Sequence, residues 1–584
     1  MTRTNEPGRA NAGRFLPMTR AEMDQLGWSA PDILLITGDA YVDHPSFGAA
    51  LLGRWLAASG FRVAIVAQPR WDNSDDIARL GRPGLFAGVT AGALDSMLAH
   101  YTAFRKKRHD DAYTPGGEAG KRPNRACTVY TSLVRHAFPG LPVVIGGIEA
   151  SMRRATHYDF WTDAMRRSIL FDSKADLLVY GMAERSILEV ARRLRASGLD
   201  SAGADRRAAK KLLEGIPGTV YVADGVPAGV ESRQLPSHEE IVSDPGKLMT
   251  ATLILEQQAH NGTPWLTQAH LERTLVIAPP ATPLASKELD ELYALPFTRM
   301  AHPSYAKAPP AVEMIQFSVA SHRGCASGCS FCALALHQGR NISSRSRESI
   351  LSEIKSMTSH PAWRGSITNI GGATVNMWGA SCAANPAVCH RTSCLWPDIC
   401  RSFQADQKGL ADLMRAARRI PGVKHVRTAG GIRHDLALTD RNYMEALVGE
   451  FTGGQLTVAP EHKSDKLLAL MRKPPFAVFE QFLGEFEQLS RRCGKEQYVI
   501  PYLMSAFPGC TDADMRELTA WLKQRGWRPQ QVQCFIPTPG TVATAMYCAA
   551  IDPSGRPLHV ARTDAERLRQ HGILSGTSTA ERGR

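Results

Sequence analysis

The first third of the chain alternates continuous apolar runs with segments in which apolar residues recur every three to four positions. Each run indicates a strand buried on both faces, because both sides of its pleat are apolar. The helical segments present one apolar face, as Phe47, Leu51 and Leu52 do. This alternation predicts an α/β fold with a doubly wound parallel sheet over residues 28–200, and it places any ligand at the carboxyl ends of the strands. The apolar runs are 33–37, 62–66, 141–147 and 175–181.

A second βα alternation begins near residue 311 and contains about six units. It predicts an incomplete barrel of the (β/α)6 type over residues 311–550, with catalytic groups at the C-terminal ends of its strands. Residues 201–310 are less regular: 218–222 and 273–279 resemble strands, and we interpret the stretch as a connector or an embellishment of the first domain. The basic, polar stretch 1–27 is interpreted as a mobile tail, and the polar stretch 551–584 is expected to be disordered.

Composition is that of an ordinary globular protein, with 43% hydrophobic and 21% charged residues among 584. No apolar run approaches the roughly 20 residues that a bilayer span needs, and the N-terminus lacks the apolar segment of a signal peptide. We therefore expect a cytoplasmic protein that does not contact membranes. Thiols stay reduced in that compartment, so the twelve cysteines indicate metal binding rather than disulfides.

The chain carries an excess of positive charge, because Lys and Arg outnumber Asp and Glu by 69 − 56 = 13. Such an excess attracts anions, which makes nucleic acid one candidate partner. The densest basic stretch, 105–125, is rich in Gly and Pro and is interpreted first as a solvated surface loop. Charge alone does not identify RNA as a ligand.

Three cysteines, Cys325, Cys329 and Cys332, lie within eight residues in the loop after the first predicted barrel strand. Their C-x3-C-x2-C spacing differs from the C-x2-C pairs of structural zinc sites, and no fourth cysteine follows closely. Three thiolates can hold three corners of a [4Fe–4S] cube and leave one iron open for another ligand. Three reduced thiols without a metal are the simpler interpretation, and the spacing disfavours it.

Together with Phe331, which directly precedes the third cysteine, the triplet resembles the radical S-adenosylmethionine (radical SAM) superfamily. The resemblance implies two cofactors, one [4Fe–4S] cluster and S-adenosylmethionine, whose amino and carboxylate groups bind the open iron. It also implies that the reduced cluster cleaves S-adenosylmethionine to a 5′-deoxyadenosyl radical. The electron would come from a reductant such as flavodoxin or ferredoxin.

Seven further segments make the resemblance closer, to the YgiQ-type family of radical SAM proteins. They are "GDAYVDHPSFG", "GGIEASMRR", "HPSY", "GGATVNMWG", "GIRHDL", "VAPEH" and "PTPGT". The resemblance extends over roughly residues 28–550. It implies the cofactor chemistry and leaves the substrate unidentified.

Two pairs of residues are candidates for contact with the cofactor. Gly371 and Gly372 resemble the superfamily glycine pair that approaches the methionyl amino group, although Ala373 replaces the acidic residue that often follows; a tight turn is the alternative. Glu461 and His462 end a predicted strand in the barrel mouth, where they contact cofactor or form a structural pair.

The N-terminal domain resembles, in its place along the chain, the cobalamin-binding module of many radical SAM enzymes. That module supplies histidine to cobalt from a D-x-H-x-x-G loop. Here Asp43 and His44 are adjacent and Gly48 is four residues on, so the pattern fails. The sequence therefore predicts that this domain does not bind cobalamin and that His44 packs within its loop, with ligation by the neutral His44 ring as the alternative.

Four more cysteines, Cys382, Cys389, Cys394 and Cys400, fall in an insertion, 382–400, between the second and third predicted barrel strands. Their C-x6-C-x4-C-x5-C spacing fits no common zinc finger. A turn-rich insertion has little core of its own, so a bound metal would hold it together. We interpret the four as a second iron–sulfur cluster, with zinc as the next choice and free thiols as the simplest alternative.

Two classes of function are consistent with these features. The first is a radical SAM enzyme that modifies an unknown substrate. The second is a non-catalytic binding protein that is stabilised by zinc in its cysteine sites. RNA is one candidate ligand of such a protein. The spacing of the first three cysteines and the barrel context favour the enzyme, and the sequence identifies neither substrate nor product.

Overall fold

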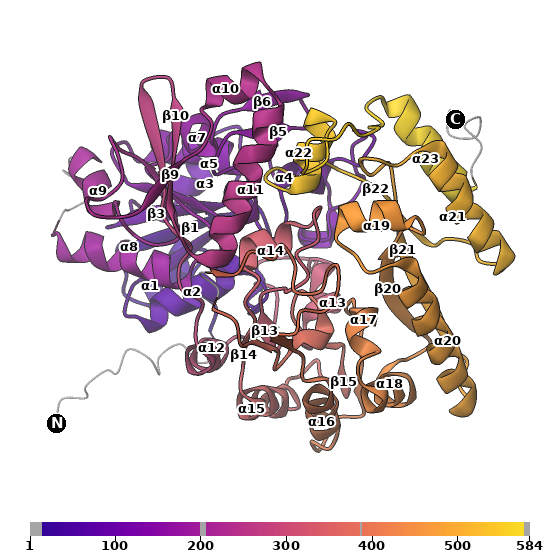
Figure 1. Ribbon diagram of the computed structural model, residues 1–584. Coiled ribbons are helices and arrows are strands. Elements are labelled where there is room, and N and C mark those ends of the chain that lie inside the picture. Colours follow the sequence, from indigo (N-terminus) through magenta and orange to yellow (C-terminus); the bar gives the residue numbers. More distant parts are fainter. Residues whose placement is uncertain (1–13, 199–205, 386–387, 577–584) are drawn as a thin grey trace.

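The computed structural model describes residues 14–198, 206–385 and 388–576. Two α/β halves lie side by side, the first indigo to magenta in Figure 1 and the second salmon to yellow, and helix α11 (Gly246–Asn261) runs between them. Within the described ranges no helix has both the length and the apolar character that crossing a membrane requires.

The first half contains a nine-stranded sheet in the order β2-β1-β3-β4-β7-β8-β11-β10-β9. Its first five strands are parallel, as predicted: β2 (Val63–Ala67), β1 (Ile33–Thr37), β3 (Phe86–Thr90), β4 (Val143–Gly146) and β7 (Leu177–Val179). The next strands are β8 (Thr219–Val222), β11 (Arg273–Ile277) and β10 (Trp265–His270), paired antiparallel, and β9 (Ser232–Gln234), parallel to β10.

Of the two interpretations of residues 201–310, the embellishment of the first domain agrees with the structure, because their described part supplies four strands of this sheet. Strands β8 and β11 coincide with the strands expected at 218–222 and 273–279, whereas β9 and β10 were not predicted. Strand β10, for example, alternates buried and half-buried residues, while β9 is exposed throughout. The continuous apolar pattern that identifies a central parallel strand is missing from both.

Alternate residues of the parallel strands enter two separate apolar cores, one on each face of the sheet. Leu34 and Ile36 face a core shared with helix α5 (Ala126–Ala137). Ile33 and Leu35 face the core on the other side, which contains residues of α2 (Gly48–Ala58) and α8 (Glu184–Ala196). Burial on both faces explains why these strands are continuous apolar runs.

The strands of the second half pair in the order in which they occur along the chain. Strand β12 (Ser318–Ala320) is parallel to β16 (Asn369–Gly371), and β15 (Ser366–Ile367) is parallel to β19 (His425–Val426). A parallel bridge joins Ile432 to Val458 of β20 (Gln455–Glu461), which pairs with β21 (Tyr498–Ser505) and then β22 (Gln531–Cys534). No pairing among the described residues joins β22 to β12, so the series does not close into one sheet.

Helices separate these strands and cover one large apolar core. They are α15 (Arg347–Met357), α16 (Gln407–Arg418), α20 (Phe476–Arg492) and α21 (Asp512–Gln524). This alternation is the order that the predicted incomplete barrel requires, although the strands form several short sheets.

Both predicted tails contain ordered structure. Residues 14–27 are not mobile: helix α1 (Arg20–Gln25) begins with a capping box, and Leu16, Met18 and Met23 are buried. Near the other end, α23 (Asp564–Ser575) packs against α21. A few apolar residues spaced among polar ones anchor each segment, a pattern too sparse to predict order. Residues 1–13 and 577–584 lie outside the described ranges.

A buried ion pair fixes the loop after β1. Arg54 of α2 lies 2.5 Å from Asp43, and both side chains are almost fully buried. The same carboxylate accepts a hydrogen bond of 2.8 Å from the backbone N–H of Thr298. Asp43 thereby connects the first sheet to the segment that leads into the second half.

We expect Asp43→Asn to lower the free energy of unfolding by about 3–5 kcal/mol, because it leaves the Arg54 guanidinium buried without a countercharge. Thermal unfolding followed by circular dichroism measures this change in stability. Where the two halves unfold in separate transitions, the shift is read from the transition that the substitution moves. The control is Asp72→Asn, which removes the exposed partner of Arg70 and should leave the curve unchanged. Equal shifts in the two variants would contradict this role for Asp43.

Candidate metal centre and adjoining cavity

The three-cysteine loop follows β13 (His322–Arg323) and ends at α14 (Ala333–Gln338). Gly324 and Gly328 adopt left-handed backbone conformations, with φ of +88° and +59°. A Cβ atom at Gly324 would collide with the carbonyl oxygen of Asn341, and one at Gly328 with that of Thr392. The loop is therefore held tightly against two neighbouring segments, and only glycine fits these two positions.

The structure brings the three thiols together. Cys325 is buried, and Cys329 and Cys332 are partly buried. Burial raises the pKa of the Cys332 thiol to about 12, and the neighbouring Cys329 and Cys325 raise it further in the same direction. Free thiols here stay protonated, so binding must release their protons to a metal that bonds the sulfur.

A cluster suits this donor set better than a single ion does. Among the residues of the described ranges, no three His, Cys, Asp or Glu side chains are arranged to hold one metal ion. The thiolates of a [4Fe–4S] cube bind three different irons, so they need not converge on one point. Three soft sulfur donors in a close-wrapped loop fit that group.

Two buried cations lie beside the thiols. Arg433 Nη1 is 3.9 Å from Cys329 Sγ, and the guanidinium pairs with Asp435. Burial acts to raise the pKa of Asp435, but Arg433 outweighs it and brings that pKa down to about 2. Lys473 Nζ lies 3.7 Å from Glu461 Oε1, and burial raises the pKa of Glu461. Arg433 and Lys473 thus supply positive charge beside the sulfur atoms, where it would offset the negative charge of thiolates.

Of the residues predicted from "VAPEH" and the cysteine loop, one lies in this environment and two have structural contacts. Glu461, at the end of β20, is buried in a left-handed conformation (φ +69°) near the thiols. His462 accepts a 3.0 Å hydrogen bond from the backbone N–H of Ser464. Phe331 packs edge-on against Phe507, with ring centroids 6.3 Å apart. The contacts of His462 and Phe331 are therefore packing contacts.

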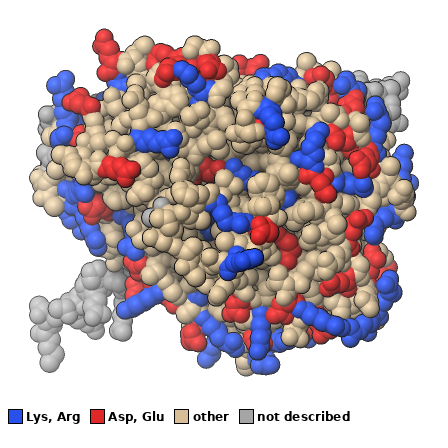
Figure 2. Space-filling view, in the orientation of Figure 1, with Lys and Arg blue, Asp and Glu red and all other residues tan. Residues whose placement is uncertain are grey.

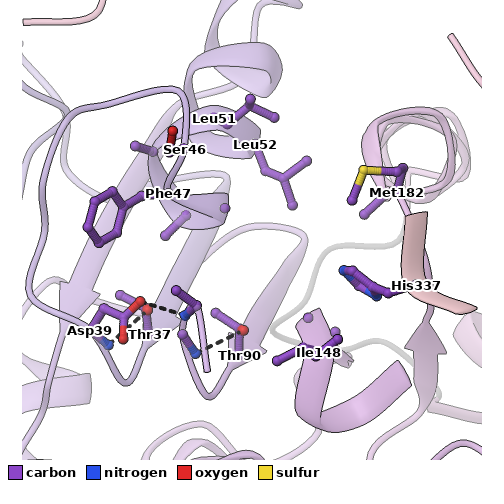
Figure 3. Close-up of a pocket in the computed structure, with 18 of the residues that line it drawn as sticks. Thr37, Asp39, Ser46, Phe47, Leu51, Leu52, Thr90, Ile148, Met182 and His337 are labelled. Carbon is purple, nitrogen blue, oxygen red and sulfur yellow. Dashed lines mark hydrogen bonds between the residues drawn. The ribbon is translucent and has the colours of Figure 1, made fainter. Parts of the chain in front are cut away.

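A cavity of about 660 Å³ lies between the two halves. One wall is the carboxyl end of the parallel strands, where Thr37, Asp39 and Thr90 are drawn in Figure 3, and Met182 and His337 lie across from them. The volume is that of a cofactor or small-molecule site. The position is the one predicted for a ligand of the first sheet.

The segment after β16 connects this cavity to the thiols. Gly371, Gly372 and Ala373 line the cavity, and the next residue, Thr374, places Oγ1 3.9 Å from Cys325 Sγ. A Cβ atom at Gly372 would lie 2.6 Å from the His322 carbonyl oxygen and 2.7 Å from its Nε2. The glycine pair thus permits a close approach of two backbones, and the tight-turn alternative alone does not explain that contact.

Polar groups without partners face the same cavity. His322 Nε2 and His337 Nδ1 are buried and have no hydrogen-bond partner among the described residues. Burial lowers the pKa of each histidine to about 4, so both rings are neutral at pH 7. Burial also raises the pKa of Asp39 to about 6, although Arg122 opposes it. Unsatisfied buried groups are costly, which makes them candidates for ligand contacts.

His44 does not line this cavity. Its Nδ1 accepts a 3.1 Å hydrogen bond from the backbone N–H of Ser46, and its Nε2 lies 2.9 Å from Arg299 Nη1. The ring is packed within the loop, in agreement with the preferred interpretation of the sequence.

The cysteine-rich insertion lies directly against the first cysteine loop. Cys394 is buried, Cys389 and Cys400 are partly buried, and Cys382 is exposed. Burial raises the pKa of Cys394 to about 11; Arg340 opposes the rise, and the other three thiols of the insertion add to it. The other three thiols therefore lie near Cys394.

Sequence reasoning missed the cations and the cavity histidines. Arg433 and Asp435 stand in the quoted "GIRHDL" segment, so a signal for them existed and only their role was unassigned. Lys473 carries no such signal, because it approaches the site only through the fold. His322 and His337 flank the cysteine loop in the sequence, and only their place on the cavity wall was not predictable.

The basic stretch is exposed over residues 105–110, and farther on its arginines are buried or paired. Arg122 is fully buried between Asp39 and Asp111, and Arg125 pairs with Asp159. On the face shown in Figure 2, Lys and Arg are interspersed with Asp and Glu. That face has no concentrated basic patch of the kind that nucleic-acid binding uses.

Comparison with known proteins gives consistent sequence similarities. The family described as radical SAM N-terminal matches residues 15–318. The chain is 49% identical to a UPF0313 protein of Geobacter sulfurreducens, over 96% of this chain and 92% of that protein. It is 44% identical to the UPF0313 protein YgiQ of Salmonella typhimurium, over 93% and 82% of the respective chains.

A solved structure overturns the prediction that cobalamin is absent. The radical SAM methyltransferase TsrM from Kitasatospora setae, with cobalamin and a [4Fe–4S] cluster bound, aligns with a TM-score of 0.51. The identity is 14%, and the alignment covers 92% of this chain and 84% of TsrM. This similarity establishes the fold, and it is a fold that holds cobalamin in TsrM. The prediction was wrong because loop spacing tests one mode of cobalt ligation and leaves the rest of the fold untested.

We expect Gly372→Ala to lower the free energy of unfolding by about 1–3 kcal/mol, because the new methyl group must displace His322. Gly431→Ala is the matched control, since a Cβ atom there meets no other atom within 4 Å. Thermal unfolding midpoints of the two variants provide the measurement. If both variants unfold at the same temperature, the close approach of Gly372 to His322 does not exist.

Proposed function

The chain belongs to the UPF0313 family, and we propose that it is a radical SAM enzyme in which Cys325, Cys329 and Cys332 bind a [4Fe–4S] cluster. One observation carries the proposal. The thiols share a buried loop, and Thr374 beside them continues directly from the glycine wall of a cofactor-sized cavity. A molecule in that cavity is therefore adjacent to the metal-binding loop.

The surrounding residues supply what an anionic cluster requires. Each thiol must lose its proton to bind iron, and Arg433 and Lys473 offset the negative charge that results. Asp435 and Glu461 hold these two cations in position. When bound, the cluster supplies the electron that cleaves the sulfonium of S-adenosylmethionine, and the buried loop keeps water away from the radical.

Gly371 and Gly372 are the proposed contact for the methionyl end of S-adenosylmethionine. Both line the cavity, and neither carries a side chain that would separate a ligand from the backbone. Because Ala373 replaces an acidic residue, that contact falls to backbone groups. An external low-potential donor such as flavodoxin or ferredoxin would provide the electron.

We also propose that the cavity binds a corrinoid. Its place at the carboxyl ends of β1, β3 and β4 and the likeness in fold to TsrM support this assignment. The unpartnered nitrogens of His322 and His337 are neutral donors on its wall. His44 is excluded from this role in its observed position, because Ser46 and Arg299 occupy its two ring nitrogens.

A non-catalytic protein with zinc in its cysteine sites is the alternative. Zinc binding would leave the cavity and its unpartnered histidines without a role. The two functions differ in iron and acid-labile sulfide content, which a zinc protein lacks.

Replacing Cys325, Cys329 and Cys332 by alanine should abolish the formation of 5′-deoxyadenosine, because no cluster remains to deliver the electron. The assay is anaerobic reconstitution, reduction with dithionite and chromatographic measurement of 5′-deoxyadenosine from S-adenosylmethionine. Cys493→Ala serves as the control, since this exposed thiol lies outside both cysteine groups. Product above background from the triple variant would refute the assignment.

The corrinoid assignment has a separate test. Leu52 points toward the cavity in Figure 3, so Leu52→Trp should narrow it and weaken binding of hydroxocobalamin at least about tenfold. Titration followed by absorbance measures binding, with Leu351→Trp, outside the cavity, as the control. If the unmodified protein binds no corrinoid, this assignment fails while the proposal for S-adenosylmethionine stands.

A further inference from the structure

The cysteine-rich insertion is built into the first cysteine loop. Its ends pair as two antiparallel strands, β17 (Ser381–Cys382) and β18 (Phe403–Gln404). Between them, the Cys394 N–H donates a 3.0 Å hydrogen bond to the carbonyl of Ala326, and the Ser393 hydroxyl donates to the carbonyl of Ser327. Both acceptors stand between Cys325 and Cys329.

The other three thiols of the insertion lie near Cys394. The Cys400 N–H donates a 2.8 Å hydrogen bond to the carbonyl of Cys394, and both cysteines contact one small apolar cluster that also contains Cys325. Cys382 and Cys389 lie close enough to affect the Cys394 thiol electrostatically. Soft donors are thus gathered in a segment that has little other core.

A buried cation with two unpartnered nitrogens, Arg340, lies at the same place. Arg340 is 7% exposed, and its Nη2 donates a 2.6 Å hydrogen bond to the Arg391 carbonyl within the insertion. Its Nε and Nη1 have no hydrogen-bond partner among residues 14–198, 206–385 and 388–576. Arg340 also borders Cys329 and Cys332 across a small cavity, so it lies between the two cysteine groups.

The buried guanidinium of Arg340 would be stabilised by an anion beside it. A buried guanidinium with free N–H groups is unfavourable unless a negative group accepts from it. Thiolates and sulfides of a metal centre accept such hydrogen bonds, and Cys394 and Cys389 act on Arg340 electrostatically. The neighbouring carboxylate, Glu256, pairs with Arg472.

We propose that Cys382, Cys389, Cys394 and Cys400 bind a second iron–sulfur cluster, with Arg340 beside it. Each cysteine gives up its thiol proton and forms one Fe–S bond. The spacing excludes the paired C-x2-C ligands of common zinc sites. The thiols also do not converge to hold one metal ion in the described residues, whereas the ligands of a cluster bind separate irons.

Metal analysis of the full-length protein, purified without oxygen, tests the proposal. Two [4Fe–4S] clusters correspond to about eight irons and about eight sulfides per chain. The triple alanine variant at Cys325, Cys329 and Cys332 should keep about four irons and retain cluster absorption and a dithionite-induced electron paramagnetic resonance signal. This readout does not depend on activity, and it separates failure of the second site from failure of the first.

The reciprocal variant replaces only two ligands that are not buried, Cys382→Ser and Cys389→Ser, so that folding is preserved. It should lose about four irons and keep the first cluster, and Cys493→Ser, at another exposed thiol, should lose none. Three outcomes would overturn the proposal: a folded triple variant without iron, an unchanged iron content in the double variant, or one zinc per chain that the double variant loses.

Discussion

Negative charge on buried sulfur requires buried positive charge, and the second half of the structure is arranged around that requirement. The thiols of Cys329 and Cys332 are held in apolar surroundings that favour the protonated form. Arg433 and Lys473 are buried as well, which is unfavourable unless a countercharge is present. Asp435 and Glu461 pair with them and also lower the net positive charge of the site. The ion pairs and the thiols therefore form one electrostatic unit, in which removing any member leaves another uncompensated.

The same loop also determines where a ligand can bind. Gly372 approaches His322 too closely for any side chain, and this contact brings the end of β16 against the start of the cysteine loop. The first sheet contributes the opposite wall, because the carboxyl ends of its parallel strands face the cavity between the two halves. Asp43 and Arg54 fix the loop after β1, and Thr298 attaches to the same carboxylate. The cavity is thus a property of two halves held in register, and neither half encloses it alone.

Prediction from sequence succeeded where one local pattern determines the structure. Runs such as 33–37 are apolar on both faces, and only a central parallel strand buries both. Strand β10 failed this criterion because its faces differ, and the tail around Met23 failed because three apolar residues are too few to define a period. The three cysteines were found from spacing alone. Lys473 was not, because its distance from the thiols along the chain hides a proximity that only tertiary structure creates.

The two cysteine groups cannot be treated as independent modules. Gly328 is needed because the Thr392 carbonyl occupies the place of its Cβ atom, so the first loop takes its conformation only with the insertion in position. Conversely, the insertion is anchored through Cys394 and Ser393 to the backbone between Cys325 and Cys329. A metal bound at either group would therefore stabilise the backbone that carries the other. Arg340 lies where the two groups meet, and its unpaired N–H groups make a negative charge favourable on both sides.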